Sequence, residues 1–232
     1  GGGAYEGRYT VPEEVAVPEE GATFELAVEL HGCGLGGSPF GVRVSNQPVI
    51  ITWNPNDRHQ WVALSDDLLE TRYVNGPGSH QSSKNGLVRA THGFSSGVHY
   101  WEVTFPNDDA RGAGYPSIGV VTQSCPLGGD TEFAIGGSHG KGWGWYTSGF
   151  ERVHAGSKSG GSLSGASSSN KYGLLLNMDS GTLSLYINGT LKDAAFSSLQ
   201  GKGPLYPAVE AGTLSQRTIR ANFQAVLPVS LE

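Results

Sequence analysis

The sequence predicts an all-β protein, a bent antiparallel β-sandwich made of two stacked sheets. Its 232 residues include 36 glycines and 12 prolines, more chain breakers than a helical protein accommodates. Clean helical spacing nowhere extends beyond about ten residues. The clearest alternation of apolar and polar residues places Leu183, Leu185 and Ile187 on one face of a strand. With 37% hydrophobic residues, the chain is long enough to bury a core without disulfides.

Residues 172–190 are the centre of this predicted fold. A short apolar run over 174–176 leads into the turn residues 178–181, where Asp caps its own backbone and Gly tolerates positive φ. The alternating strand that follows ends at Asn188-Gly189, the strongest two-residue hairpin signal. Strand, turn, strand and turn make an antiparallel meander, which is too narrow to be stable alone in water. Its apolar face therefore requires a second sheet.

Residues 1–45 differ in composition and pattern from the rest of the chain. The acidic segment VPEE occurs at 11–14 and again at 17–20, and its prolines restrict it to a loop or an edge strand. Residues 24–30 alternate between apolar and polar, which predicts a strand, and a glycine-rich turn separates them from a second short strand over 38–44. We therefore expect a separate β segment before the main fold.

A linker over 46–52 precedes a second region, 53–228, that contains many short strands. Those with the clearest patterns are expected at 61–64, 98–105, 117–122, 142–147, 205–209 and 218–223. Residues 156–169 are rich in Gly and Ser and predict a long loop. Short strands separated by turns in this number are typical of a sandwich.

Six motifs in this second region occur in the order expected of a SPRY (B30.2-like) domain, which residues 53–228 resemble. They are GVHYWEV at 97–103, IGV at 118–120, GWGW at 142–145, NMDSGTLS at 177–184, LYPAV at 205–209 and NF at 222–223. The resemblance implies a bent β-sandwich whose loops form a shallow site for a short peptide of a partner protein.

Within that group the chain is most similar to the SPRY domains of the SOCS-box family. The near counterparts are WNPNDR at 53–58, CPL at 125–127 and WGW at 143–145. That family's peptide site uses Arg and Pro in an early loop, Tyr in a middle loop and a Trp-Gly pair after the Tyr-Pro-x-Val strand. Here the early loop over 76–83 lacks an obvious Arg-x-Pro, Phe133 takes the middle position, and Thr213-Leu214 stands in the Trp-Gly place. We expect the scaffold to transfer and the peptide preference to differ. No SOCS box precedes Glu232, so these residues are not expected to recruit a ubiquitin ligase themselves.

Residues 1–45 resemble the last part of a filamin-type immunoglobulin repeat. A Gly-x-Tyr strand at 7–9, the alternating strand over 24–30 and a GSPF strand starting at 37 follow one another as in such repeats. The GSPF match is the most specific of the three. The resemblance implies a partial immunoglobulin-like segment, about half of one repeat.

Charge and cysteine usage exclude several classes of partner. The net charge is −6 and the 15 Lys and Arg residues are scattered, whereas a nucleic-acid binder concentrates its basic residues on one face. No apolar run reaches the length of a membrane span, so we expect no membrane partner. Cys33 and Cys125 lie far apart and favour a reducing compartment. The expected localisation is cytoplasmic, with a cytoskeletal or ciliary place left open.

Apparent catalytic and metal motifs lack the context that their chemistry needs. Residues 93–97 match G-x-S-x-G, but a nucleophile elbow requires a strand before the serine and a helix after it. Residues 32–37 match G-x-G-x-x-G without a βαβ unit. His31 and Cys33 lack the second pair of ligands that a closed zinc site needs. We therefore expect no enzyme, metal, cofactor or small-molecule substrate.

The leading hypothesis is a protein-interaction module that binds its partner through loops, because the strands of a sandwich hold loop clusters at its ends. The expected partner-binding residues are Arg72, Tyr73, His80, Phe133, Thr213 and Leu214. Two alternatives stay open. One is a structural scaffold segment of a cytoskeletal or ciliary assembly, indicated by an exposed apolar patch on a sheet face. The other is the substrate-recognition part of a ubiquitin ligase whose other domains are absent from this sequence.

Overall fold

The chain divides into two compact units, residues 1–50 and residues 51–232. The computed structural model describes residues 23–26, 29–30, 33–34, 40–43, 49–74, 85–106, 116–129, 134–161, 167, 169–212 and 218–228. In the first unit β1 (Thr23–Leu26) pairs antiparallel with β4 (Phe40–Arg43), and β2 (Glu29–Leu30) pairs with β3 (Cys33–Gly34). The division between the units falls inside the predicted linker over 46–52.

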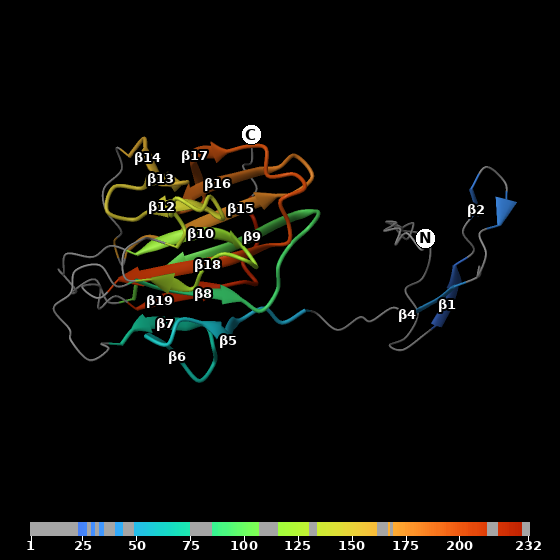
Figure 1. Ribbon diagram of the computed structural model, residues 1–232, viewed down its shortest axis with the longest axis horizontal. Helices are drawn as coiled ribbons and strands as arrows, with labels where there is room; N and C mark the ends of the chain where they lie inside the picture. Colours follow the sequence, from blue (N-terminus) through green and yellow to red (C-terminus); the bar gives the residue numbers. More distant parts are fainter. Residues whose placement is uncertain are drawn as a thin grey trace. The chain divides into compact units, whose positions relative to one another are not determined.

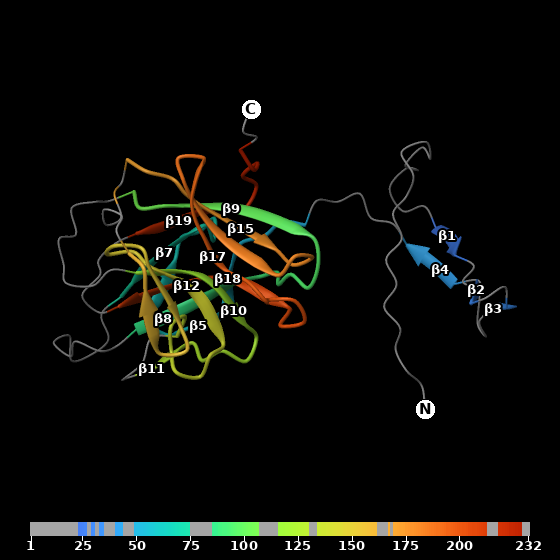
Figure 2. The same cartoon turned by 90° about the horizontal axis from the view of Figure 1, so that it is seen from above.

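The second unit is a sandwich of two antiparallel sheets (Figures 1 and 2). The first, eight-stranded sheet has the order β11-β8-β18-β10-β12-β13-β14, with β5 paired to β8. Its strands are β5 (Trp53–Arg58), β8 (Asn85–Ala90), β10 (Ser117–Thr122), β11 (Gly128–Gly129), β12 (Gly142–Tyr146), β13 (Glu151–His154), β14 (Ser157–Ser159) and β18 (Leu205–Gly212).

The second, seven-stranded sheet has the order β17-β16-β15-β9-β19-β7-β6. Its strands are β6 (Val62–Leu64), β7 (Glu70–Tyr73), β9 (Val98–Thr104), β15 (Tyr172–Asn177), β16 (Thr182–Ile187), β17 (Thr190–Phe196) and β19 (Ile219–Asn222). The described part of the chain contains no helix. The predicted all-β sandwich of two antiparallel sheets is therefore confirmed.

The predicted central meander is formed by β15, β16 and β17. Leu174 lies opposite Leu185, and Leu176 lies opposite Leu183, so one face of this pair is apolar. The hairpin after β16 places Asn188 and Gly189 at φ values of 51° and 79°, the left-handed conformation that a two-residue turn of this kind requires. The sequence signal and the observed turn agree.

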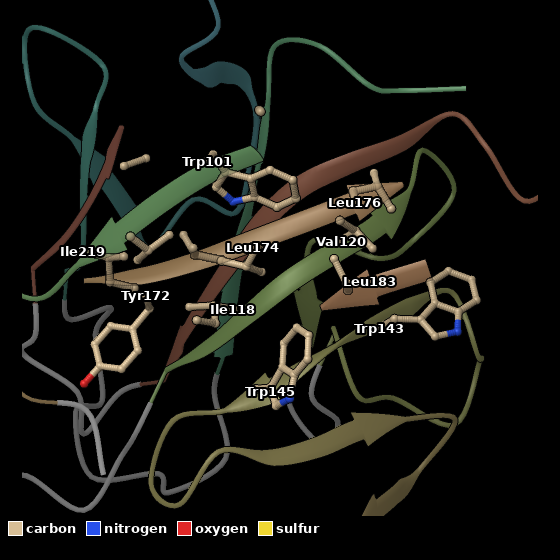
Figure 3. Packing of buried hydrophobic residues seen from close by; sticks show 14 of the residues in the cluster. Trp101, Ile118, Val120, Trp143, Trp145, Tyr172, Leu174, Leu176, Leu183 and Ile219 are labelled. Atoms are coloured by element: carbon tan, nitrogen blue, oxygen red, sulfur yellow. The ribbon is translucent and has the colours of Figure 1, made fainter. Parts of the chain in front are cut away.

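The core lies between the apolar faces of the two sheets (Figure 3). Trp101 of β9 and Trp145 of β12 are 2% and 0% exposed and belong to this cluster. β10 supplies Ile118 and Val120, which are fully buried in the same cluster. Burial of a large apolar side chain contributes about 1.5–3 kcal/mol, so this layer is the main source of the sandwich's stability.

A second apolar cluster covers the other face of the first sheet. It consists of Leu87, Val121, Cys125, Ala134, Ile135, Val153 and Ala208. Because side chains alternate along a strand, Leu87 and Ala208 point away from the central core that their neighbours Val88 and Val209 enter. The segment that begins at Ala134 therefore packs against the outer face of this sheet.

Candidate functional site

Strand pairing brings residues that flank three of the predicted binding segments to one end of the first sheet. Asn85, the first residue of β8, pairs with Gly212, the last residue of β18. It also pairs with Gly129 of β11. Asn85 follows the early segment over 75–84. Gly212 directly precedes Thr213, where the late segment begins, and Gly129 lies four positions before Phe133, which belongs to the middle segment. The early, middle and late segments therefore start or end within one small part of the sheet.

The second sheet contributes the ends of two more strands at this end of the sandwich. β7 ends at Tyr73, where the early segment begins, and β19 starts at Ile219, where the late segment ends. Ile219 lies opposite Thr71 in the antiparallel pair of β19 and β7. A cavity of about 260 Å³ opens beside these strands and is lined by Ala63, Leu64, Ser65, Glu70, Thr71, Arg72 and Thr218.

Arg72 is the predicted residue whose described position best suits partner contact. Its side chain is exposed and lines the cavity. Glu70, the carboxylate in the same lining, accepts a hydrogen bond of 2.8 Å from Nη1 of Arg220. Within the described residues no ion pair involves Arg72. The guanidinium is therefore free to meet a carbonyl or carboxylate oxygen of a ligand.

The turn beside this cavity is held by Asp67. Its Oδ1 accepts hydrogen bonds from the Ser65 hydroxyl at 2.5 Å and from the Leu69 N–H at 3.0 Å, and its Oδ2 lies 2.9 Å from Nη2 of Arg220. These hydrogen bonds, that of Ser65 first, lower the pKa of Asp67 to about 2. The carboxylate is therefore ionised at neutral pH and is engaged by its own turn and by Arg220 of β19.

Tyr73 lies in the core. Only 7% of its surface is exposed, and its ring centroid is 6.1 Å from that of Trp61. Replacement of Tyr73 by alanine is therefore expected to affect packing in addition to any effect on a partner. His80, Phe133, Thr213 and Leu214 lie outside the described residues, and their role in partner binding stays a prediction.

Sequence reasoning missed Glu210, a buried acid next to this end of the sheet. Its side chain is 1% exposed. Its Oε1 accepts a hydrogen bond of 2.7 Å from the N–H of Ala134, and its Oε2 accepts one of 3.0 Å from the N–H of Ile135. Burial raises the pKa of Glu210 to about 7, against the opposing effect of these two hydrogen bonds. The available sequence signal was a single acidic residue within the otherwise uncharged strand 205–212.

Sequence reasoning also missed a buried cation on the same face of the sheet. Arg89 is 2% exposed and forms an ion pair with Asp57 of β5. Its Nε donates to the carbonyl of Thr122 at 3.3 Å, and its Nη2 donates to the carbonyl of Cys125. Gln123 donates to the other oxygen of Asp57 at 3.2 Å. This network fixes residues 122–125 on the sheet.

The segment that matches G-x-S-x-G lies directly before a strand. Residues 93–97 lead into β9, and Phe94 forms an isolated bridge to Leu205, so the segment is followed by a strand, as predicted. Cys125 is buried, and burial raises the pKa of its thiol to about 12. Among the described residues, no group of three or more His, Cys, Asp or Glu side chains could hold a metal ion. That part of the chain also has no helix long and apolar enough to cross a membrane.

Comparison with known proteins agrees with the resemblance of the sequence to SPRY domains. The family model of the SPRY domain matches residues 98–226. SPRY domain-containing SOCS box protein 2 of Homo sapiens is 32% identical over 168 residues, which cover 68% of this chain and 60% of that protein. Protein gustavus of Drosophila melanogaster is 29% identical over 168 residues, covering 69% of this chain and 58% of its own length. The chain thus spans about 60% of the length of the curated relatives it matches.

Solved structures agree on the fold. The SPRY domain of human HERC1 superposes with a TM-score of 0.57 at 17% identity, covering 75% of this chain and 99% of that one. The TRIM65 PSpry domain superposes with a TM-score of 0.54 at 21% identity, covering 74% of this chain and 91% of that one. At such low identity these likenesses concern the arrangement of the two sheets.

Proposed function

The chain belongs to the SPRY domain family, and on that premise we propose that it recognises a short peptide of a partner protein at the loop end of its sandwich. SPRY domains are protein-interaction modules. The observation that carries the proposal is the pairing of Asn85 with both Gly212 and Gly129. It gathers the flanks of the early, middle and late segments on one rigid support.

Rigidity of that support favours binding, because a site that is already ordered loses less entropy when its partner docks. β8 is buried along its whole length, and Asn85 itself is 9% exposed. The ladder between β18 and β8 runs from Ala208↔Arg89 to Gly212↔Asn85. The segments that leave this ladder thus start from backbone positions that hydrogen bonds have already fixed.

The cavity beside Arg72 supports a polar anchor for the peptide. Arg72 contributes a cation, and the neighbouring acid Glu70 is already bonded to Arg220. A peptide side chain or backbone group with carbonyl or carboxylate oxygens would complement this lining. We expect recognition to combine such a contact with the predicted positions His80, Phe133, Thr213 and Leu214.

The test uses the whole chain, residues 1–232, and peptides selected on it from a random display library. Arg72→Ala should lower the affinity for the selected peptide by about tenfold or more, equivalent to about 1.4 kcal/mol of binding free energy. The matched substitution Lys202→Ala removes an exposed cation shortly before the opposite end of β18 and should leave the affinity within about twofold. Equal binding by both variants would place the site elsewhere on the sandwich.

A second candidate function, a scaffold segment that docks through a sheet face, also has an observation in its favour. On the outer face of the second sheet, Tyr100 and Tyr186 pack edge to face with centroids 6.0 Å apart. The registers place Leu175 beside Tyr100 and Leu191 beside Tyr186, and Leu191 is 51% exposed. Leu191→Ser in the same peptide experiment separates the two functions, since only a partner docked on this face would lose affinity.

The relatives named for a SOCS box give the ligase alternative its support. If the full-length protein carries such a box, the SPRY domain would select the protein that the ligase modifies. We also propose that residues 1–45 form the last part of a filamin-type repeat, supported by the GSPF motif and by the antiparallel pairing of β1 with β4. The two separated cysteines support a cytoplasmic location.

A further inference from the structure

We propose that Glu210 is a positioning residue for partner binding: its carboxylate fixes the backbone of Ala134 and Ile135 and thereby sets where the middle segment leaves the sheet. This inference rests on the proposed function. The middle segment is the chain directly before Ala134, which includes Phe133. The two hydrogen bonds, at 2.7 Å and 3.0 Å, are the contacts on which the inference depends.

Chemically, a carboxyl group suits this place better than an amide. Two adjacent backbone N–H groups point at one side chain, and each needs an acceptor because it is buried. A carboxylate offers two acceptor oxygens, whereas an amide offers one oxygen and an NH₂ group that would oppose the second N–H. Glu210 thus holds two successive residues at once and restricts the backbone more than a single hydrogen bond could.

The surface of the sheet beneath Ile135 leaves room for its backbone. A Cβ atom at Gly142 would lie 2.5 Å from the carbonyl oxygen of Ile135, and one at Gly144 would lie 2.9 Å from Cγ2 of Ile135. Both glycines belong to β12. The backbone at Ile135 therefore lies directly on a strand without side chains at these points. It is also held further along, where the N–H of Gly156 donates to the carbonyl of Gly136 at 2.8 Å.

The anchor belongs to the loop end itself. Glu210 lies opposite Leu87 of β8 and Ser117 of β10, two residues before the Gly212–Asn85 pair at the end of the ladder. Any displacement of Ala134 would therefore also shift Phe133, the residue directly before it.

Few other charged groups face this carboxylate from the described elements packed around it. β8 brings Arg89, which is already paired with Asp57. The segment after β10 brings the buried thiol of Cys125, near which Lys141 donates to the carbonyl of Ser124 at 3.1 Å. His59 lies against Gly128. Among the described residues of this face, the N–H groups of Ala134 and Ile135 are thus the direct hydrogen-bond partners of Glu210.

The experiment compares wild type, Glu210→Gln and Glu102→Gln in the whole chain. Glu102, a half-buried acid on the outer face of the second sheet, is the matched control. Amide hydrogen exchange at Ala134 and Ile135 reports the anchor directly, with Ile118 and Val120 as core references. Exchange at one of the two anchored amides should become about tenfold faster in Glu210→Gln, while the core amides and all amides of Glu102→Gln keep their protection relative to wild type.

Affinity for a peptide selected on the wild-type chain is then measured between pH 6 and pH 8. Burial raises the pKa of Glu210 and outweighs the two N–H groups, which favour the ionised form. The anchored state therefore prefers the protonated acid, and a rising pH favours release of Ala134 and Ile135. Wild-type affinity should fall several-fold over this range, whereas Glu210→Gln should bind more weakly throughout and show a flatter profile. A merely structural role would change unfolding without changing this profile in the folded protein.

The outcomes separate the inference from the proposed function. Faster exchange together with weaker, pH-insensitive binding supports the positioning role. Unchanged exchange, or faster exchange with unchanged affinity, overturns it while peptide binding by the wild type still stands. If Glu210→Gln does not fold, Glu210→Asp, which has a shorter side chain, replaces it. Faster amide exchange and weaker peptide binding than wild type in Glu210→Asp support the role. Exchange and affinity equal to those of wild type overturn it. Failure of the wild type to bind any selected peptide defeats the proposed function and this inference with it.

Discussion

The indole N–H of Trp145 in the first sheet donates to Oδ2 of Asp193 in the second, with 2.9 Å between the two atoms. Arg152 of β13 reaches the same carboxylate, and its Nε lies 2.8 Å from Oδ2. One acid on β17 thus joins the two sheets at a point where the core alone would leave the indole N–H without an acceptor. Burial acts to raise the pKa of Asp193, but the hydrogen bonds from Arg152 and Trp145 hold it below its ordinary value.

Removal of this joint should destabilise the sandwich. Asp193→Ala leaves the Trp145 N–H unsatisfied, and we expect a loss of about 1–3 kcal/mol in the free energy of unfolding, measured by urea denaturation. Asp66→Ala, which removes an exposed acid from a turn, serves as the control and should change the free energy by less than about 0.5 kcal/mol. Equal stability of the two variants would mean that the joint contributes nothing.

Tyr73 should prove to be a packing residue. Because 93% of its surface is removed from water, as its 7% exposure implies, Tyr73→Ala should lower the unfolding free energy by about 3–5 kcal/mol. Tyr73→Phe keeps the ring against Trp61 and should cost much less. Thermal unfolding of both variants distinguishes this expectation from a role limited to partner contact, in which the alanine variant would be as stable as wild type.

Replacement of Gly119 and of Gly173 by alanine should differ in whether the resulting steric clash can be relieved. A Cβ at Gly119 would lie 2.1 Å from the carbonyl oxygen of Trp143, whereas a Cβ at Gly173 would lie 2.1 Å from Oη of Tyr100. Backbone cannot move without separating β10 from β12, so Gly119→Ala should cost about 1–3 kcal/mol or more in unfolding free energy.

The clash at Gly173 involves the end of a side chain. Tyr100→Ala should therefore make the structure tolerant of Gly173→Ala, which a double-mutant cycle in urea would detect as a coupling energy. Additive free-energy losses in that cycle would contradict the observed contact.

Global stability should depend on pH through Glu210. Folding raises the pKa of this carboxyl from 4.5 to about 7, so the folded chain binds one more proton than the unfolded chain between these values. The contribution is fully present below about pH 4.5 and is lost as the pH rises through about 7. It is of the order of 3 kcal/mol.

The difference in unfolding free energy between wild type and Glu210→Gln isolates this group from the other titrating residues. Wild type should lose stability relative to the variant from about pH 4.5 to about pH 7 and then remain constant. Urea titrations at several pH values measure it. A difference that does not vary with pH would show that the carboxyl has an ordinary pKa in the folded state.

Local patterns were enough to predict much of the fold. Alternation over 182–187 and the Asn188-Gly189 signal predicted the strand β16 and the turn that follows it, because side-chain period and left-handed φ are properties of neighbouring residues. Arg72, which the sequence predicts to bind a partner, has an exposed side chain that lines the cavity, and its role in binding stays a prediction.

Only the tertiary structure determined which polar residues are buried and what they hold. Glu210 meets Ala134 across 76 positions of the chain, and Arg89 meets Cys125 across 36, so no spacing rule could connect them. Tyr73 is one of the predicted partner-binding residues, yet the pairing of β7 with β6 and β19 places its ring in the core. Periodicity is a local property and was therefore readable in the sequence, whereas the partner of a buried charge is chosen by the way in which distant strands pack.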